Sequence, residues 1–262
     1  MAHQRPTRPR RQPDLTALAL GASPFLLLVT WELLSRTQVL VPAYVLPPPT
    51  RIGAGILTVL TATWFPPQLG ATVFETLAGF CLGSLAGLLI GVLMGYAALF
   101  RRLGQPYVVA LQITPKVILA PLFITWFGFG FTSKIVMAAT IAFFPVVINT
   151  VVGLANVDEN SLLFMRSLVA SRLQTFLKLA WPSALPFVFA GLRTSLTLAL
   201  TGALVAEFVG AKVGLGSLIK TFSFESDAGL VFAVLTIVSA VGLGLYGLLA
   251  YVDRRVVFWR RS

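Results

Sequence analysis

The chain is poor in the residue types on which most enzyme and metal sites depend. Its 262 residues include one histidine, one cysteine and only nine Asp and Glu. The histidine, His3, lies near the N-terminus, so we expect neither a histidine-based metal site nor a histidine-dependent nucleophile. Cys81 has no second cysteine to pair with, which excludes an intramolecular disulfide. No Gly-x-x-x-x-Gly-Lys-Ser/Thr motif occurs, so the chain is not expected to hydrolyse nucleotide by itself.

Charged residues are also scarce, at 11%, whereas apolar residues make up 57% of the chain and the mean hydropathy is +0.88. These values exclude an ordinary soluble domain and predict an all-α, polytopic membrane protein. A transmembrane helix needs about 20 mainly apolar residues. Windows that meet this requirement are 15–34, 72–98, 107–127, 134–154, 184–205 and 230–251. We therefore predict about six transmembrane helices.

The spans divide the chain into regions that leave no room for a separate soluble domain. In order, the regions are a disordered basic arm (1–14), a first transmembrane helix (15–36), a proline-rich loop or interfacial segment on the outer side (37–70), a transmembrane core (71–251) and a basic tail (252–262). Within the outer segment, residues 51–62 have the pattern of an amphipathic interfacial helix.

The positive charge is distributed unevenly between the two sides of the membrane. Cytoplasmic loops of membrane proteins retain Lys and Arg. With six spans, thirteen of the 20 Lys and Arg fall on the side of both termini and five on the other. Both termini are therefore predicted to be cytoplasmic. The basic residues form short juxtamembrane groups without interleaved aromatics, which argues against nucleic-acid binding.

A polar, helix-patterned segment at 157–181 interrupts the apolar sequence on the predicted cytoplasmic side. Asp158 is a suitable N-cap for a first helix, in which apolar residues recur at helical spacing. Ser171 and Gln174 have the Ser-x-x-Gln spacing of a capping box, which predicts a second helix. That helix is expected to end at Pro182, where the next span follows.

The stretch RSLVASRLQTFLKLAWPSALPFVFAGLR (166–193) resembles the cytoplasmic loop of the permease subunits of bacterial ABC importers, in the nitrate, sulfonate and taurine group. Four further segments resemble the same group in the same order: LPPPTRI (46–52), TPKVILAPLFITWFGFG (114–130), FFPVVINT (143–150) and GLGSLI (214–219). Two features of the family's loop pattern, a Glu-Ala-Ala triplet and a glycine, are missing from this sequence. The triplet falls on Leu163, Phe164 and Met165, and the glycine falls on Val169.

The resemblance implies a permease of the bacterial inner membrane that forms the pathway for a small solute. Its implied partners are a second copy of the chain, two cytoplasmic ATPase subunits and an extracytoplasmic solute-binding protein. ATP and Mg²⁺ would then bind to the ATPase, and this chain would bind no cofactor and catalyse no reaction. A small anion such as a sulfonate, taurine or nitrate is the expected solute. The residues implied in coupling to the ATPase are Asp158, Leu163, Phe164, Met165, Arg166, Ser167, Ala170, Ser171 and Arg172.

Val169 is β-branched, and β-branched residues rarely adopt a positive φ. We therefore expect the first coupling helix to continue to about Ala170 before Ser171 turns the chain. Because Leu163 replaces the glutamate of the Glu-Ala-Ala triplet, Arg166 and Arg172 are the polar groups expected to contact the ATPase.

Charged groups at membrane depth are costly and are functional candidates by default. Lys116, Arg193 and Glu207 are such candidates, together with Asn149 in the FFPVVINT segment. On an ideal helix Arg193 and Glu207 differ by about 40° in direction, so both could face one lumen. Alternatively, Lys116 and Arg193 pair with backbone carbonyls, with Glu207 or with groups of a partner chain.

Glycine and proline mark two further features of the spans. Glycines recur every fourth residue at Gly79, Gly83, Gly87, Gly91 and Gly95, which predicts close helix packing, within the chain or in a dimer. Pro115, Pro121 and Pro145 are expected to interrupt helices at membrane depth and favour the third and fourth spans as pathway-lining elements.

An ion-coupled secondary transporter is the main alternative. Such a carrier needs acidic relays within the membrane and often has repeated halves. Glu75 and Glu207 are isolated in the sequence and no internal repeat is evident. The coupling segment, which a secondary carrier does not require, distinguishes the two classes.

Overall fold

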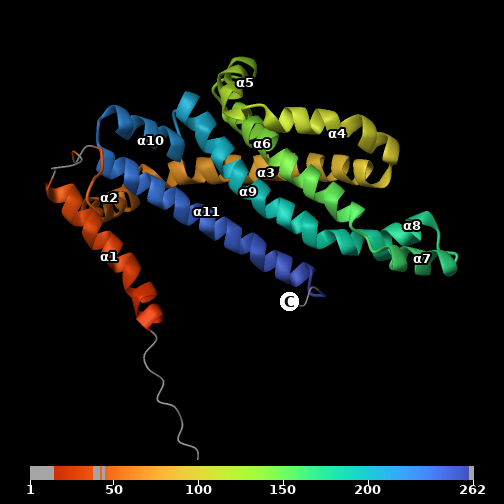
Figure 1. Ribbon diagram of the computed structural model, residues 1–262. Coiled ribbons are helices and arrows are strands. Elements are labelled where there is room, and N and C mark those ends of the chain that lie inside the picture. The colour runs from red at the N-terminus through yellow and green to blue at the C-terminus, as the bar shows by residue number, and fades with distance from the viewer. Residues whose placement is uncertain (1–14, 38–41, 43–44, 260–262) are drawn as a thin grey trace, which may run out of the picture.

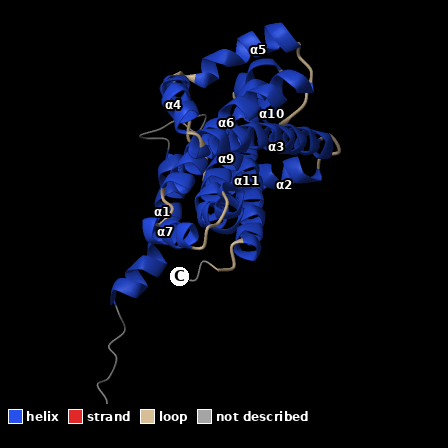
Figure 2. Ribbon diagram, turned by 90° about the vertical axis from the view of Figure 1, so that its right-hand side faces the viewer, coloured by secondary structure: helices blue, strands red, loops and turns tan. Residues whose placement is uncertain are grey.

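The computed structural model describes residues 15–37, 42 and 45–259, and this part of the chain is helical, with no strand (Figure 2). The predicted basic arm, His3 and the last three residues of the tail lie outside the described residues. The prediction of an all-α fold is therefore confirmed.

Four long helices form the centre of the molecule (Figure 1). They are α3 (Phe65–Tyr96), α6 (Phe131–Ala155), α9 (Trp181–Gly210) and α11 (Ala228–Val256). Each has the length and apolar composition needed to cross a membrane, α9 together with the turns that precede it. They correspond to four of the six predicted windows.

The predicted window at 107–127 is not a straight helix. It is divided between α4 (Ala98–Ile113), a 3₁₀ turn (Lys116–Leu119) and α5 (Ala120–Phe127), and the chain bends by 82° at the break. Pro115 causes the break because it disfavours helical geometry at Thr114, whose ψ is 129°. Pro121 and Pro145, by contrast, do not interrupt helices. Pro121 lies in the first turn of α5 and Pro145 lies inside a continuous α6.

The glycines of α3 lie against α6. A Cβ added to Gly87 would lie 2.6 Å from the carbonyl oxygen of Phe143, and one added to Gly91 would lie 2.7 Å from the Cβ of Thr150. Only glycine permits this approach of the two backbones. The ladder therefore packs within the chain, which is the first of the two predicted uses.

The N-terminal elements flank one end of the bundle. They are α1 (Leu15–Thr37), which coincides with the predicted first span, and α2 (Pro49–Thr61). The apolar face of α2, with Ile52, Gly55 and Val59, is buried in the protein, and Gly55 lies against Ala233 of α11. The prediction of a helix at 51–62 is correct, but its apolar face contacts protein instead of the membrane interface.

One helix start and one whole helix were not predicted from the sequence. The helix α3 starts at Phe65, six residues before the predicted core, because Pro66 and Pro67 occupy its first turn, where proline is favoured. A further helix, α10 (Leu215–Phe224), follows Gly214. It packs with α2, α9 and α11 around Leu215, Leu218 and Val234.

Candidate functional site

The coupling segment begins with a capped helix, α7 (Glu159–Ser167). The carboxylate of Asp158 accepts hydrogen bonds from the backbone N–H and the hydroxyl of Ser161, both at 2.8 Å. The bond from the Ser161 hydroxyl has the larger effect and the bond from its backbone N–H the next. Both hold the pKa of Asp158 below its ordinary value because they stabilise the ionised form. The predicted N-cap is confirmed.

The end of α7 differs from the prediction. Val169 has φ 54° and is 90% exposed, and the helix ends at Ser167, so the expected extension to Ala170 is wrong. The N–H of Val169 donates to the carbonyl of Arg166 and the N–H of Ala170 to that of Met165. This pair of bonds is a Schellman motif, which requires the left-handed conformation at residue 169. Residue 169 thus has the left-handed backbone conformation that glycine adopts readily, although the residue is valine.

The second coupling helix, α8 (Arg172–Thr175), starts with the predicted capping box, in which Ser171 and Gln174 bond reciprocally. It does not end at Pro182. A π-helical turn, Phe176–Ala180, joins it directly to α9, which makes residues 172–210 one continuous helix. The wider turn accommodates Pro182 because the carbonyl that its ring would meet is displaced.

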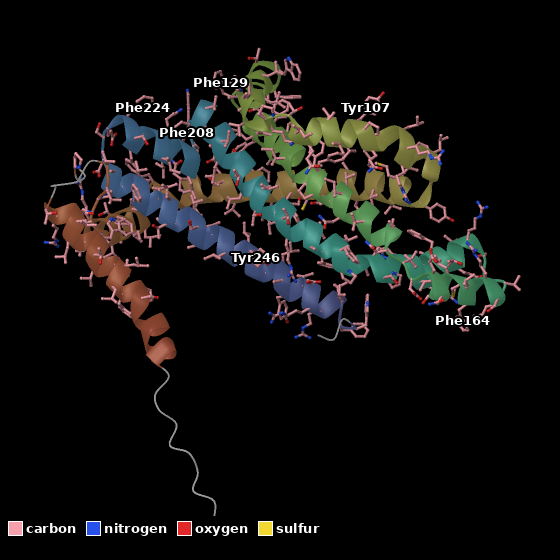
Figure 3. All side chains as sticks on the ribbon, in the orientation of Figure 1. Tyr107, Phe129, Phe164, Phe208, Phe224 and Tyr246 are labelled. Carbon is pink, nitrogen blue, oxygen red and sulfur yellow. The ribbon has the colours of Figure 1, made fainter. Side chains whose placement is uncertain are left out.

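The helices α7 and α8 lie together at one end of the molecule, beyond the spans (Figure 1). Apolar side chains are exposed there: Leu163 is 58% exposed, Phe164 62% and Leu168 60%. Phe164 lies on this segment, at the end of the molecule opposite Phe224 (Figure 3). Such a cluster outside the membrane is typical of a surface that binds another protein.

Arg166 and Arg172 face a different environment. Both line a cavity of about 600 Å³ between the coupling segment and the ends of α3 and α6, with Gly95, Leu154 and Phe176 in the same wall. Of the other predicted coupling residues, Met165 and Ala170 are half-buried, and the hydroxyl of Ser167 donates to the carbonyl of Phe164. The arginines are therefore not part of the exposed apolar cluster.

At the break in the third window, Lys116 caps the end of α4. Its ammonium donates to the carbonyl oxygen of Gln112 at 2.8 Å and lies 4.6 Å from the ring centre of Phe144. Phe144 is in the middle of α6, so Lys116 lies near mid-depth of the spans. Asn149 donates to the carbonyl of Pro145 at 2.8 Å, and its Cβ faces Gly191 of α9.

Arg193 and Glu207 are not brought together. Arg193 forms an ion pair with Asp253 in the last turn of α11, and the Tyr246 ring lies 5.9 Å from its guanidinium carbon. Glu207 lies at the other end of α9 and faces α3 and α10. Helices in this bundle cross, so one face of α9 meets different neighbours at its two ends. Asp253 was not among the partners predicted for Arg193 from the sequence.

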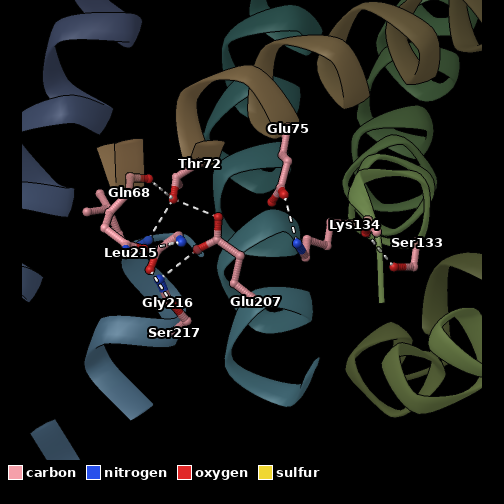
Figure 4. Close-up of polar contacts among 11 residues, drawn as sticks. Gln68, Thr72, Glu75, Ser133, Lys134, Glu207, Leu215, Gly216 and Ser217 are labelled. Carbon is pink, nitrogen blue, oxygen red and sulfur yellow. Dashed lines mark hydrogen bonds and ion pairs between the residues drawn. The ribbon is translucent and has the colours of Figure 1, made fainter. Parts of the chain in front are cut away.

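Glu207 belongs to a buried polar network that joins three helices (Figure 4). Its carboxylate accepts from the hydroxyl of Thr72 and from the N–H of Gly216, both at 2.6 Å. Thr72 in turn accepts from the N–H of Leu215 at 2.8 Å. The first N–H groups of α10 are thereby satisfied by α3 and α9, which anchors the N-terminus of that helix.

A second buried pair adjoins this network. Lys134 forms an ion pair with Glu75 at 3.1 Å, and their side chains are only 6% and 0% exposed. Glu75 is therefore not isolated. Lys134, one of the five Lys and Arg counted on the outer side from the sequence, is a buried residue of α6. The sequence contained one clue to this pair, namely single charges of opposite sign at the starts of two apolar windows.

The arrangement defines the chain as a polytopic α-helical membrane protein with a helical segment that extends beyond the spans. Residues 83–258 match the model of the binding-protein-dependent transport system inner membrane component family. Since the match covers more than half of the chain, the protein belongs to this family and is a permease subunit of an ABC importer.

Relatives within the family carry different solutes. The riboflavin transport system permease protein RibX of Chloroflexus aurantiacus is 36% identical over 94% of this chain and 91% of its own. The putative aliphatic sulfonates transport permease protein SsuC of Bacillus subtilis is 33% identical over 91% of this chain and 86% of its own. A structure of the inward-facing MetNI methionine ABC transporter matches with a TM-score of 0.61 and 21% identity, over 73% of this chain and 94% of its own, which supports the fold.

Proposed function

We propose that two copies of this permease assemble with two cytoplasmic ATPase subunits and receive their solute from an external binding protein. ATP and Mg²⁺ bind to the ATPases, and this chain contributes no catalysis. The observation that carries the proposal is the exposed apolar cluster of Leu163, Phe164 and Leu168 on a helix pair that extends beyond the spans. Both termini and this segment are cytoplasmic in the proposal, in agreement with the distribution of Lys and Arg.

The continuity of α8 with α9 supports a role in transmitting force. Residues 172–210 form one helix of 39 residues, so a displacement of α8 by an ATPase passes to α9 without a flexible loop. Such rigid-body movement of helices against each other is a common basis of alternating access.

The proposed solute is a small anion such as a sulfonate, taurine or nitrate. Of the charged residues considered for the pathway, Lys116 is the one without an acidic partner in the described part of the chain. It lies at a break between helices near mid-depth, which is where transporters often bind their substrates. The relationship to SsuC supports the same class of solute.

A flat neutral or aromatic solute is the second candidate. It is favoured by the 36% identity to RibX, which exceeds the identity to SsuC. The ring of Phe144, whose centre lies 4.6 Å from the ammonium of Lys116, can contact an aromatic ring as well as a cation.

Purification of the tagged chain from its own membranes, followed by mass spectrometry, tests the proposed partners. We expect an ATPase and a binding protein to be recovered, and recovery of the chain alone would contradict the assembly. Screening the recovered binding protein with taurine, alkanesulfonates, nitrate and riboflavin then identifies the solute class. For an anion, Lys116→Met should lower transport at least tenfold and Lys116→Arg should retain most of it.

A further inference from the structure

The cavity behind the coupling segment carries positive charge without a partner. Arg166 and Arg172 line its volume of about 600 Å³, and its described lining contains no Asp or Glu. Neither guanidinium forms a hydrogen bond or an ion pair with the described residues. Two arginines that line one space favour an anionic ligand with several oxygen acceptors, such as a phosphate.

An apolar groove adjoins this cavity on the outer face of α3. Its two parts, of about 370 and 250 Å³, share Val92 and Phe176, and the larger part shares Tyr96, Phe176 and Arg172 with the cavity. The remaining lining of the groove is apolar: Leu88, Leu89, Leu93, Leu173, Leu177 and Trp181. A single ligand that reaches past Phe176 can therefore contact both the arginines and the groove.

The dimensions of the groove correspond to one leaflet of a bilayer. From Tyr96 to Leu88 the helix α3 rises by about 12 Å. The hydrocarbon part of one leaflet is about 15 Å thick. Tyr96 lies at the end of the groove next to the arginines, and tyrosine is typical of the membrane interface.

We propose that this cavity and groove form a binding site for an anionic phospholipid. The phosphate and its headgroup lie between Arg166 and Arg172, and an acyl chain follows α3 along Leu93, Val92 and Leu89. The charge of the lining favours this occupant over a second copy of the chain. A two-fold contact between two copies would bring identical groove surfaces together. Since the lining contains no Asp or Glu, the second copy would provide no carboxylate to pair with the arginines.

Native mass spectrometry of the full-length transporter, titrated with dioleoyl phosphatidylglycerol or dioleoyl phosphatidylcholine, tests the site. We expect phosphatidylglycerol to bind more tightly than phosphatidylcholine. The double variant Arg166→Gln/Arg172→Gln should weaken phosphatidylglycerol binding about twenty-five-fold, since each arginine near an anionic headgroup contributes about a factor of five. Binding of phosphatidylcholine should change little.

The double variant Arg102→Gln/Lys178→Gln is the matched control. It removes the same charge from the same end of the molecule, and neither residue lines the cavity or the groove. It should bind phosphatidylglycerol as the unaltered protein does. Equal losses in the two double variants would overturn the proposal, and so would equal binding of the two lipids by the unaltered protein.

Two other occupants would also overturn it. Displacement of the lipid by equimolar glycerol phosphate would show that the cavity takes a small phosphate ester and that the groove contributes nothing. Efficient cross-linking of two copies through Leu89→Cys by a short bis-maleimide, in a Cys81→Ser background, would show that a second permease covers the groove. The proposal predicts neither result.

Discussion

Val169, at the end of α7, adopts a backbone conformation that costs a β-branched residue about 1–3 kcal/mol. The Schellman bonds of Val169 and Ala170 maintain it, since the carbonyls of Arg166 and Met165 would otherwise lack these partners. We expect Val169→Gly to stabilise the segment by about 1 kcal/mol, after the greater entropy of glycine in the unfolded chain is deducted. Hydrogen exchange of residues 158–175 should slow about fivefold.

Leu168→Gly is the control for this substitution. Leu168 has φ −81°, so glycine relieves no strain there and should accelerate exchange. If both variants accelerated exchange, the left-handed conformation of Val169 would not be the source of strain.

The pair of Lys134 and Glu75 provides a second prediction for single residues. Lys134→Met leaves a carboxylate without its cation at a site with 0% exposure, and loss of one partner of a buried pair costs about 3–5 kcal/mol. The double variant Glu75→Met/Lys134→Met removes both charges and should recover most of that loss. Thermal unfolding of the purified protein measures both. Additive losses in the double variant would contradict a direct pair.

Among the helices, the contact between α3 and α6 depends on glycine. Gly87→Ala would place a Cβ 2.6 Å from the backbone oxygen of Phe143, which cannot rotate away. Overpacking of this kind costs about 1–3 kcal/mol. Gly244→Ala, in α11, meets no heavy atom within 4 Å and should stabilise its helix by about 0.5–1 kcal/mol. Thermal unfolding should therefore shift in opposite directions, and a common direction would contradict the packing.

The helix pair α7–α8 is predicted to bind the ATPase through its apolar cluster. Leu163→Glu/Phe164→Glu places two charges on that surface and should lower the affinity for the ATPase at least tenfold, since such anchors dominate interface energy. Phe224→Glu, at the other end of the molecule (Figure 3), should not affect ATPase binding. Fluorescence anisotropy with labelled ATPase distinguishes them, and unchanged affinity in the first variant would exclude the cluster as the docking surface.

Most elements could be predicted because hydrophobic pattern and capping residues act locally. Asp158, Ser171 and the four long apolar windows are examples. The end of α7 could not be predicted, because the Schellman bonds outweigh the preference of valine. The pairs Lys134–Glu75 and Arg193–Asp253 link residues 59 and 60 positions apart, so they depend on helix packing that no local pattern specifies.

In the whole molecule, two polar regions lie at opposite ends of the spans (Figure 1). One contains α7, α8 and the arginine-lined cavity, and the other contains α10, held by Glu207 and Thr72. The 39-residue helix 172–210 connects both ends. Movement of the coupling segment can therefore reach the anchor of α10 through one continuous helix.

Uptake into proteoliposomes tests most directly the claim that ATP drives transport through this chain. The permease, its co-purified ATPase and the binding protein with its identified solute are reconstituted, and uptake is measured with ATP or with a proton or sodium gradient. The account predicts uptake that requires hydrolysable ATP and the binding protein and that persists when ionophores dissipate ion gradients. Uptake driven by an ion gradient without ATP would contradict it and would identify an ion-coupled carrier.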